Sequence, residues 1–271
     1  NAATLSGNGS TTGTASFATG ATLSVDPVAG DFAAAGVNFA GSTTLFFSSA
    51  LTTGNTYDVI TYSGGTLSGT SNLVKTSRGN FADTGTKLTF TAGGVLTDTW
   101  NAVSGTWQIG VSTPWSNGFD GEFWNSDTVV FDDTPGVDST ATIVGNVVPA
   151  AVNVSGATNH TFAGSGAISG SAAINKTGSG TLTIGNVNTH TGALTISEGA
   201  VVSTVSGGLS TAAATVLAGG NLNLGGISQT SGAFSITAAA ASGDTVSNGT
   251  LNPTSTNVSN ASGNAIVSAA I

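Results

Sequence analysis

The side chains that could carry out chemistry are few, and most of them lie between residues 96 and 148. Asp120 and Glu122 are two positions apart, so a strand would place both carboxylates on one face. Glycoside hydrolysis uses two carboxyl groups roughly 5–10 Å apart, one of them with a raised pKa. Because any two neighbouring acids meet that spacing, the pair is weak evidence for catalysis. We therefore expect no enzymatic activity.

A run of aspartates follows in the same segment and is a candidate calcium site. Ca²⁺ takes carboxylate and carbonyl oxygens as ligands, and no other cofactor is suggested. The ligand spacing of an EF-hand is missing, and residues 133–136 also have the composition of a turn. If calcium binds, a chelator should lower the melting temperature; a plain turn predicts no change. The candidate ligands are Asp127, Asp132, Asp133 and Asp138.

All four tryptophans of the chain lie in this segment as well. Trp107, Trp115 and Trp124 have a functional interpretation as flat surfaces for sugar rings beside carboxylates. Trp side chains also bury large areas, so a local core or cap is the alternative interpretation. The segment therefore predicts either contact with glycans or packing.

Composition and charge exclude several other kinds of site. The chain has no cysteine, so disulfides and thiolate metal sites are impossible. Four cations in 271 residues are too few to neutralise the phosphates of a nucleic acid. No apolar run reaches the roughly 18 residues of a membrane-spanning helix. His160 and His190, the two histidines, both lie in Asn/Thr turn sequences, so we expect structural roles for them.

The elements that must position these residues are β-strands. Only 6% of residues are charged, against roughly 25% in an average soluble protein. Short bursts of Val, Ile, Thr and Phe are bounded by Gly, Asn, Ser and Asp, which favour turns. No window has the period and length of a helix. Disordered chains usually combine high charge with few β-branched residues, so we predict an ordered, all-β protein.

Internal repetition predicts the architecture. The segment 181–184, Thr-Leu-Thr-Ile, recurs twelve residues later as Ala-Leu-Thr-Ile at 193–196. Short strands and Gly/Asn corners at roughly 20–25 residues per turn are typical of a β-solenoid, also called a parallel β-helix. Turns stacked about 4.8 Å apart would align their apolar residues into one buried column. We expect that column to contain Leu182, Ile184, Leu194 and Ile196.

Composition changes twice along the chain, which suggests three parts. Residues 1–95 are expected to form an N-terminal β-solenoid-like module. Residues 96–148 are the tryptophan- and aspartate-rich β segment. Residues 149–271 are expected to form a solenoid of β-strand repeats that ends in a C-terminal strand.

The repeat also resembles a known family. Gly178-Ser-Gly-Thr-Leu-Thr-Ile184 is followed by Asn186-Val-Asn-Thr-His-Thr-Gly-Ala-Leu-Thr-Ile-Ser-Glu-Gly-Ala200. This sequence resembles the autotransporter-associated β-strand repeat, which reads G-S-G-T-L-T-L and then N-T-Y-T-G-x-T-x-I-x-x-G-x-L. His190 stands at the usual aromatic position and Val201 at the usual leucine. The resemblance, which covers about residues 100–201, implies a secreted or cell-surface bacterial protein with a β-helical, fibrous passenger region and no defined catalytic activity.

The two ends of the sequence are uncharged strand candidates. An edge strand exposes unpaired N–H and C=O groups, which charged side chains normally protect from pairing. We therefore predict head-to-tail self-association by strand addition. Such a contact need not close, so it can continue as a filament; in a longer chain the same ends would join further repeats. The residues expected at these contacts are Ala2 and Leu5 at one end and Ala265, Ile266, Val267 and Ile271 at the other.

Two functions follow from these observations. The leading one is an extracellular structural protein, a subunit or segment of a bacterial surface fibre or layer. The alternative is an adhesin or polysaccharide-binding module that uses the tryptophan segment and surface glycans as partners.

Overall fold

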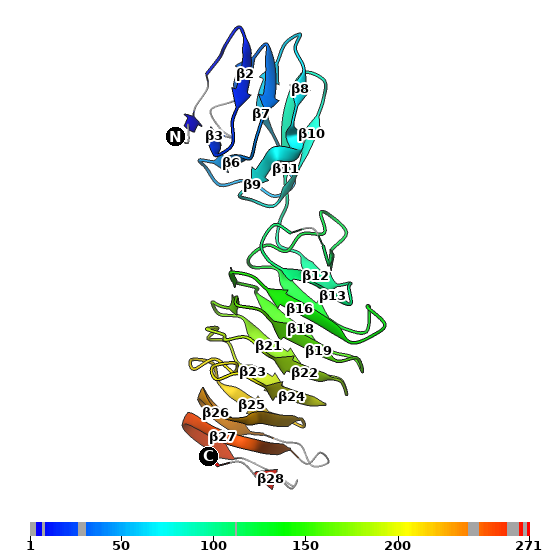
Figure 1. Cartoon of the computed structure of the whole chain (residues 1–271), viewed down its shortest axis with the longest axis vertical. Coiled ribbons are helices and arrows are strands. Elements are labelled where there is room, and N and C mark those ends of the chain that lie inside the picture. The colour runs from blue at the N-terminus through cyan, green and yellow to red at the C-terminus, as the bar shows by residue number, and fades with distance from the viewer. Residues whose placement is uncertain are drawn as a thin grey trace. The chain divides into compact units, whose positions relative to one another are not determined.

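The computed structural model describes residues 4–6, 9–26, 31–111, 113–237, 244–258, 266–267 and 270–271. The chain divides into two compact units, residues 1–94 (unit 1) and 95–271 (unit 2) (Figure 1). In the part of the chain that is described, the parallel β-solenoid runs through about 11 turns, and the fold is nearly free of helix. The predicted all-β solenoid is confirmed.

Unit 1 contains three sheets with parallel strands, one for each face of a solenoid. The third sheet is completed by an antiparallel hairpin, whose strand β11 pairs with β7 where a further parallel strand would otherwise lie. A short 3-10 helix, Thr70–Asn72, precedes the last strand of the first sheet. The strands are β1 (Thr4–Ser6), β3 (Ala21–Val25), β6 (Thr43–Phe47) and β9 (Leu73–Lys75); β2 (Thr14–Phe17), β5 (Gly36–Phe39) and β8 (Leu67–Ser68); and β4 (Phe32–Ala34), β7 (Thr56–Tyr62), β10 (Gly79–Asp83) and β11 (Lys87–Ala92).

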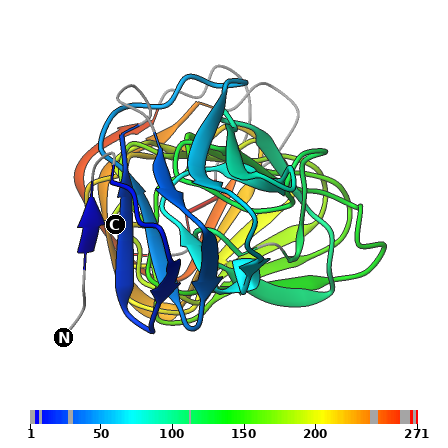
Figure 2. The ribbon, with the colours of Figure 1, turned by 90° about the horizontal axis from the view of Figure 1, so that it is seen from above.

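Unit 2 is a longer solenoid whose strands lie over one another when seen from above (Figure 2). One face holds β12 (Thr97–Trp100), β15 (Thr128–Phe131), β18 (Ala151–Val154), β21 (Ala173–Lys176), β23 (Leu194–Ile196) and β25 (Thr215–Leu217). The second face holds β13 (Ser104–Trp107), β16 (Ser139–Ile143), β19 (His160–Ala163), β22 (Thr181–Ile184) and β24 (Ala200–Ser203). A shorter third sheet pairs β17 (Asn146–Val147) with β20 (Ala167–Ile168).

The last strands of unit 2 connect these faces. Strand β26 (Asn221–Ile236) is long enough to pair with β24 at its start and with β25 at its end. Gly225 and Gly226 lie between those two parts and have φ angles of 69° and 79°. Residues other than glycine rarely adopt this left-handed backbone conformation. Strand β27 (Thr245–Val258) follows β26 in parallel, and β28 (Ile266–Val267) pairs with the start of β27.

The register of the strands agrees with the predicted repeat length. On the first face of unit 2, paired residues are 23, 22, 20, 21 and 19 positions apart, from the pair Thr128 and Ala151 to the pair Thr215 and Phe234. Inward positions alternate with outward ones along the strands of this face, as in the half-buried and buried pattern of β21. Because the turn length is nearly constant, equivalent residues of successive turns lie next to each other.

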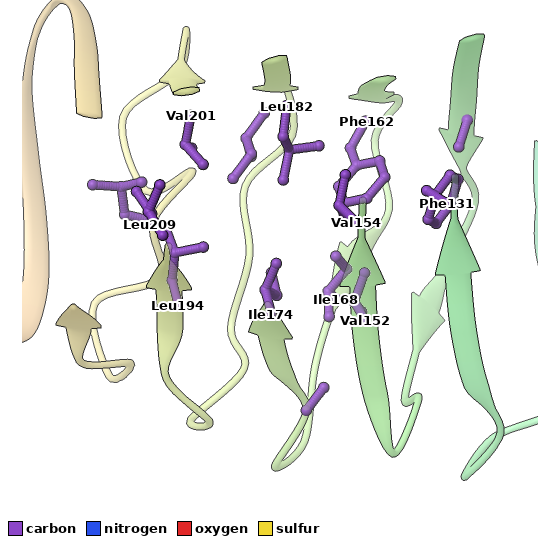
Figure 3. Packing of buried hydrophobic residues seen from close by; sticks show 14 of the residues in the cluster. Phe131, Val152, Val154, Phe162, Ile168, Ile174, Leu182, Leu194, Val201 and Leu209 are labelled. Carbon is purple, nitrogen blue, oxygen red and sulfur yellow. The ribbon is translucent and has the colours of Figure 1, made fainter. Parts of the chain in front are cut away.

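The four apolar residues predicted to form one column are all buried, but they form two columns. Leu182 and Ile184 lie on β22, whereas Leu194 and Ile196 lie on β23, and each is at most 1% exposed. Figure 3 shows Leu182 and Leu194 on strands of opposite faces, with their side chains pointing into the same interior. The two copies of the motif are thus two sides of one turn, and the prediction of burial is confirmed.

Candidate functional site

The tryptophan-rich segment is an enlarged first turn of unit 2. Thr97 pairs with Thr128, 31 positions later, and Ser104 pairs with Thr140, 36 positions later. These separations exceed the 19 to 23 of the following turns on the first face. The additional residues include strand β14 (Trp115–Ser116), which pairs antiparallel with β12.

The tryptophans of this turn lie mostly inside it. Trp107 is fully buried and Trp115 is 5% exposed, so neither presents a ring face to a sugar. The ring of Trp107 packs edge to face against Trp115 with centroids 5.6 Å apart and against Phe162 of the next turn at 5.7 Å. This corrects the stacking interpretation for these two residues, because their faces fill the interior. Trp124 is half-buried, and its indole N–H donates a hydrogen bond to Glu122 Oε2 at 3.0 Å.

Asn117 organises the loop that carries the two candidate acids. Its Nδ2 donates to Asp120 Oδ1 at 3.0 Å and to Asp98 Oδ1 at 2.8 Å. Its Oδ1 accepts from three backbone N–H groups, those of residues 119, 120 and 121. Asp98 is fully buried on β12 and is a site residue that its local sequence does not indicate. The candidate pair thus has structural contacts, since Asp120 Oδ1 also accepts from the backbone of Glu122 at 3.1 Å.

Asp127, the first candidate calcium ligand, is fully buried and closes the enlarged turn. Its Oδ1 accepts a hydrogen bond from the backbone N–H of Leu96 at 2.8 Å, and its Oδ2 accepts from that of Trp124 at 2.6 Å. Both oxygens are therefore occupied by the protein backbone.

Asp133 and Asp138 instead tie their own turn to the next one. Asp133 Oδ1 accepts from the backbone N–H of Thr158 at 2.8 Å, and Asp138 Oδ1 accepts from that of Asn159 at 2.9 Å. The side-chain amide of Asn159 also donates to Asp138 Oδ2 at 2.9 Å. The Asn159 side chain and then its backbone N–H hold the pKa of Asp138 below the usual value, and the backbone N–H of Thr158 does so first for Asp133. Asp132 accepts from the backbone of Thr134, two residues on.

The structure does not bring the four aspartates together. Among the described residues, no group of three or more His, Cys, Asp or Glu side chains could hold a metal ion. The carboxylates lie at separate places in the turn and accept hydrogen bonds from the backbone there. The calcium site expected from Asp127, Asp132, Asp133 and Asp138 is therefore not assembled in this structure.

A pocket of about 510 Å³ opens beside the buried tryptophans. Its lining comes from the connection between β12 and β13, from β13 itself and from the residues around β14. Trp115 lines it, together with Ser104, Thr106 and Thr113. The enlarged turn therefore forms a concave polar surface, although the flat aromatic platform predicted from the sequence is absent at Trp107 and Trp115.

The described residues expected at assembly contacts belong to a sheet of unit 1 and to the last residues of unit 2. Leu5 is half-buried on β1 and packs against the core of unit 1. Ile266 and Val267 form β28, and Ile271 is 49% exposed. Ala2 and Ala265 lie outside the described residues.

Asn188 joins three successive turns through its side chain. Its Oδ1 accepts from the backbone N–H of Ile168, 20 residues earlier, at 2.9 Å. Its Nδ2 donates to the backbone C=O of Gly208, 20 residues later, also at 2.9 Å. Ile168 belongs to β20 of the short third sheet, so the buried amide adds side-chain hydrogen bonds to the backbone bonds that join the turns here, such as Thr189 N–H to the C=O of Ile168 at 2.9 Å.

The comparison with family models identifies the segment that contains this corner. Residues 174–202, from within β21 to within β24, match the model of the passenger-associated-transport-repeat, a repeat of autotransporter passengers. This segment is therefore similar to a passenger-associated-transport-repeat. Searches of curated proteins and of solved structures find no match to the chain. Together, the repeat and the β-solenoid fold indicate a secreted or cell-surface protein of the passenger type. The described part of the chain contains no helix with the length and apolar character of a membrane span.

The corner of the matched segment requires glycine where it approaches the preceding turn. A Cβ atom on Gly192 would lie 2.4 Å from the carbonyl oxygen of Ala172, well inside contact distance. His190 Nδ1 donates to the backbone C=O of Gly192 at 2.9 Å, which fixes the ring inside the corner. The histidine at the usual aromatic position is thus buried and hydrogen-bonded.

Both histidines of unit 2 are buried, His160 on a strand and His190 in the connection between β22 and β23. His160 lies on β19, where its ring accepts or donates a 2.8 Å hydrogen bond with Ser139 Oγ. Burial lowers the pKa of His160, although the nearby Asp132 and Asp133 oppose that shift, and burial also lowers the pKa of His190. Both imidazoles are therefore neutral in the folded protein near pH 7.

We expect unit 2 to lose stability as the pH falls below about 6.5, the pKa of an unfolded histidine. The folded pKa values are lower, so the unfolded chain binds protons first and the free energy of unfolding decreases. Aspartates contribute only at lower pH, because their pKa values start from about 3.9. Urea unfolding at pH 7.5 and pH 5.5 measures the effect. His190→Phe should reduce the difference between the two pH values, and an unchanged difference would mean that His190 does not contribute.

Proposed function

We propose that this chain is a structural segment of a bacterial extracellular fibre or surface layer, without catalytic activity, in which copies associate head to tail by stacking β-strands. The observation that carries the proposal is the parallel ladder of each unit. The repeat match and the fold support an extracellular passenger-type protein, and the ladder suggests how such a protein would assemble.

The outer strands at the start of unit 1 favour such stacking. β1 is the first strand in the order β1-β3-β6-β9, and β2 is the first in the order β2-β5-β8. The residues of both strands, Thr-Leu-Ser and Thr-Ala-Ser-Phe, are uncharged. An unpaired strand edge without charged side chains is a template for another strand.

The last described residues of unit 2 include exposed apolar side chains. Val258, at the end of β27, is 55% exposed, and Ile271 is 49% exposed. Apolar side chains at this end and uncharged strand edges at the other are compatible with a contact between different ends of two copies. A contact of that kind is heterologous and continues as a filament unless its geometry closes a ring.

Electron microscopy of the purified full chain tests the proposal, with filaments as the expected result. Thr4→Lys places a charge on the outer strand β1 and should abolish filaments while the circular dichroism spectrum remains that of a folded β protein. Thr22→Lys is the matched control, because Thr22 is the partner of Thr4 on the inner strand β3. Deletion of residues 264–271 should also abolish filaments. Filaments that persist in Thr4→Lys and in the deletion variant, or their absence from the unaltered protein, would contradict the proposal.

A further inference from the structure

We propose that the 510 Å³ pocket beside Trp115 binds an uncharged sugar ring of a polysaccharide. The site is distinct from the strand ends proposed for assembly and uses different residues. It also differs from the surface stacking that the sequence suggested, since hydrogen bonds inside a pocket would provide the recognition.

The pocket lies in the enlarged first turn of unit 2. Later turns of unit 2 repeat after 19 to 23 residues on the first face, whereas 36 positions separate Ser104 from its partner Thr140. Insertions in repeat proteins form loops on one face, which is often the face that binds. Here the insertion supplies Val111, Thr113, Pro114 and Trp115 to the lining.

The chemistry of the lining matches a neutral carbohydrate. The hydroxyl groups of Ser104, Thr106 and Thr113 can each donate and accept hydrogen bonds, and so can the side-chain amide of Asn101. Sugar hydroxyls require both roles from their partners. An apolar part of the lining, which includes Val111 and Pro114, suits the C–H groups of a pyranose ring.

Charge favours an uncharged sugar over a uronic acid. The residues that line the pocket include no charged side chain. The chain carries a formal net charge of −9, with thirteen acids against four cations. A carboxylate on the ligand would therefore find no cation among the lining residues. The negative net charge of the protein would also repel it.

The pocket is held in shape by the packed turn behind it. The backbone N–H of Asn101 donates to the C=O of Pro114 at 2.8 Å, and Trp115 pairs with the buried Trp100 across two strands. A Cβ on Gly105 would lie 2.7 Å from Pro114 Cγ, so the two segments approach closely. A pocket that is already formed avoids the entropy cost of ordering a loop on binding, and its volume is within the roughly 300–1,000 Å³ usual for small-molecule sites.

Intrinsic fluorescence of the full chain provides the test, because all four tryptophans lie in this turn. The probes are the neutral trisaccharides cellotriose, maltotriose, mannotriose and chitotriose, with trigalacturonate as the anionic comparison. We expect a saturable change with at least one neutral trisaccharide and weaker binding of trigalacturonate. Calorimetric titration of the same probes detects binding that leaves the fluorescence unchanged. If no neutral probe binds by either method, or if trigalacturonate binds most tightly, the proposal is wrong.

Two isosteric variants locate the site. Thr106→Val and Thr113→Val each remove one hydroxyl group from the lining and should weaken binding roughly three- to tenfold. Thr142→Val is the matched control, because Thr142 is the partner of Thr106 on the next turn and does not line the pocket. Equal weakening by Thr142→Val and Thr106→Val would place the ligand on the sheet face and overturn the assignment to the pocket. Unchanged binding in Thr106→Val and Thr113→Val would do the same.

Discussion

Replacing Asn188 by alanine is expected to lower the free energy of unfolding of unit 2 by roughly 2–6 kcal/mol. The substitution leaves two buried backbone groups without their partner, the N–H of Ile168 and the C=O of Gly208. Each buried polar group that loses its hydrogen bond costs about 1–3 kcal/mol. Because the partners belong to the turns before and after, the substitution removes the side-chain links of three turns at one corner and leaves only their backbone hydrogen bonds.

Urea unfolding followed by circular dichroism measures the change. Val187→Ala is the matched control, since Val187 is next to Asn188 but is 55% exposed, and it should change stability by less than about 0.5 kcal/mol. Asn188→Leu separates hydrogen bonding from volume, because leucine fills the corner but offers neither a donor nor an acceptor. We expect it to destabilise unit 2 about as strongly as Asn188→Ala. Stability close to that of the unaltered protein in Asn188→Leu would show that the amide contributes packing alone.

The role of Asn188 could not be predicted from local sequence, and the reason is physical. Two of its partners are 20 residues away, one in each direction, and the third, the side chain of Asn186, lies within the corner itself. The regular turn length predicts that some residue occupies this corner on every turn, but only the register shows which backbone groups it meets. A polar residue inside a solenoid corner, repeated at the turn length, is the signal that would have indicated a hydrogen-bonding role.

The burial of the apolar columns could be predicted from the sequence, because it depends only on the alternation along each strand and on the turn length. Alternation of small polar residues with Leu182, Ile184, Leu194 and Ile196 specifies one buried face for each strand, and the turn length specifies stacking. Sequence spacing did not reveal that the two motifs lie on different faces of one turn. That assignment depends on the sharpness of the corner at residues 185–193.

The tryptophan segment was ambiguous because packing and sugar binding use the same residues. An indole that stacks on a sugar and an indole that fills a turn have identical local sequences, and only burial distinguishes them. Trp107 proved to be fully buried, whereas Trp115 lines the pocket with its small exposed part. Asp98 was missed for a related reason: its partner Asn117 is 19 residues away, and an isolated acid on a strand suggests a solvated side chain.

The second large effect is expected for Leu194→Ala, which should lower the free energy of unfolding by about 2–5 kcal/mol. Leu194 is fully buried and lies between its strand partners Ile174 and Thr215 on the turns before and after. Figure 3 shows its side chain directed into the interior that it shares with Leu209. Truncation removes apolar contacts and leaves a cavity, because the strands on both sides are held by the ladder and cannot close the gap.

Chemical denaturation of the single variant and of two companions checks this expectation. Leu194→Met keeps most of the volume and should cost less than about 1.5 kcal/mol. Thr195→Ala changes the neighbouring outward-facing residue of β23 and should stay within about 0.5 kcal/mol of the unaltered protein. A loss of stability in Leu194→Ala no greater than that in Thr195→Ala would mean that position 194 faces solvent, and the register of the solenoid would then be wrong.

A solenoid turn contacts only its neighbours. The loss of stability should therefore be greatest in the turns that contain Ile174 and Thr215, and hydrogen exchange should report the fastest opening there.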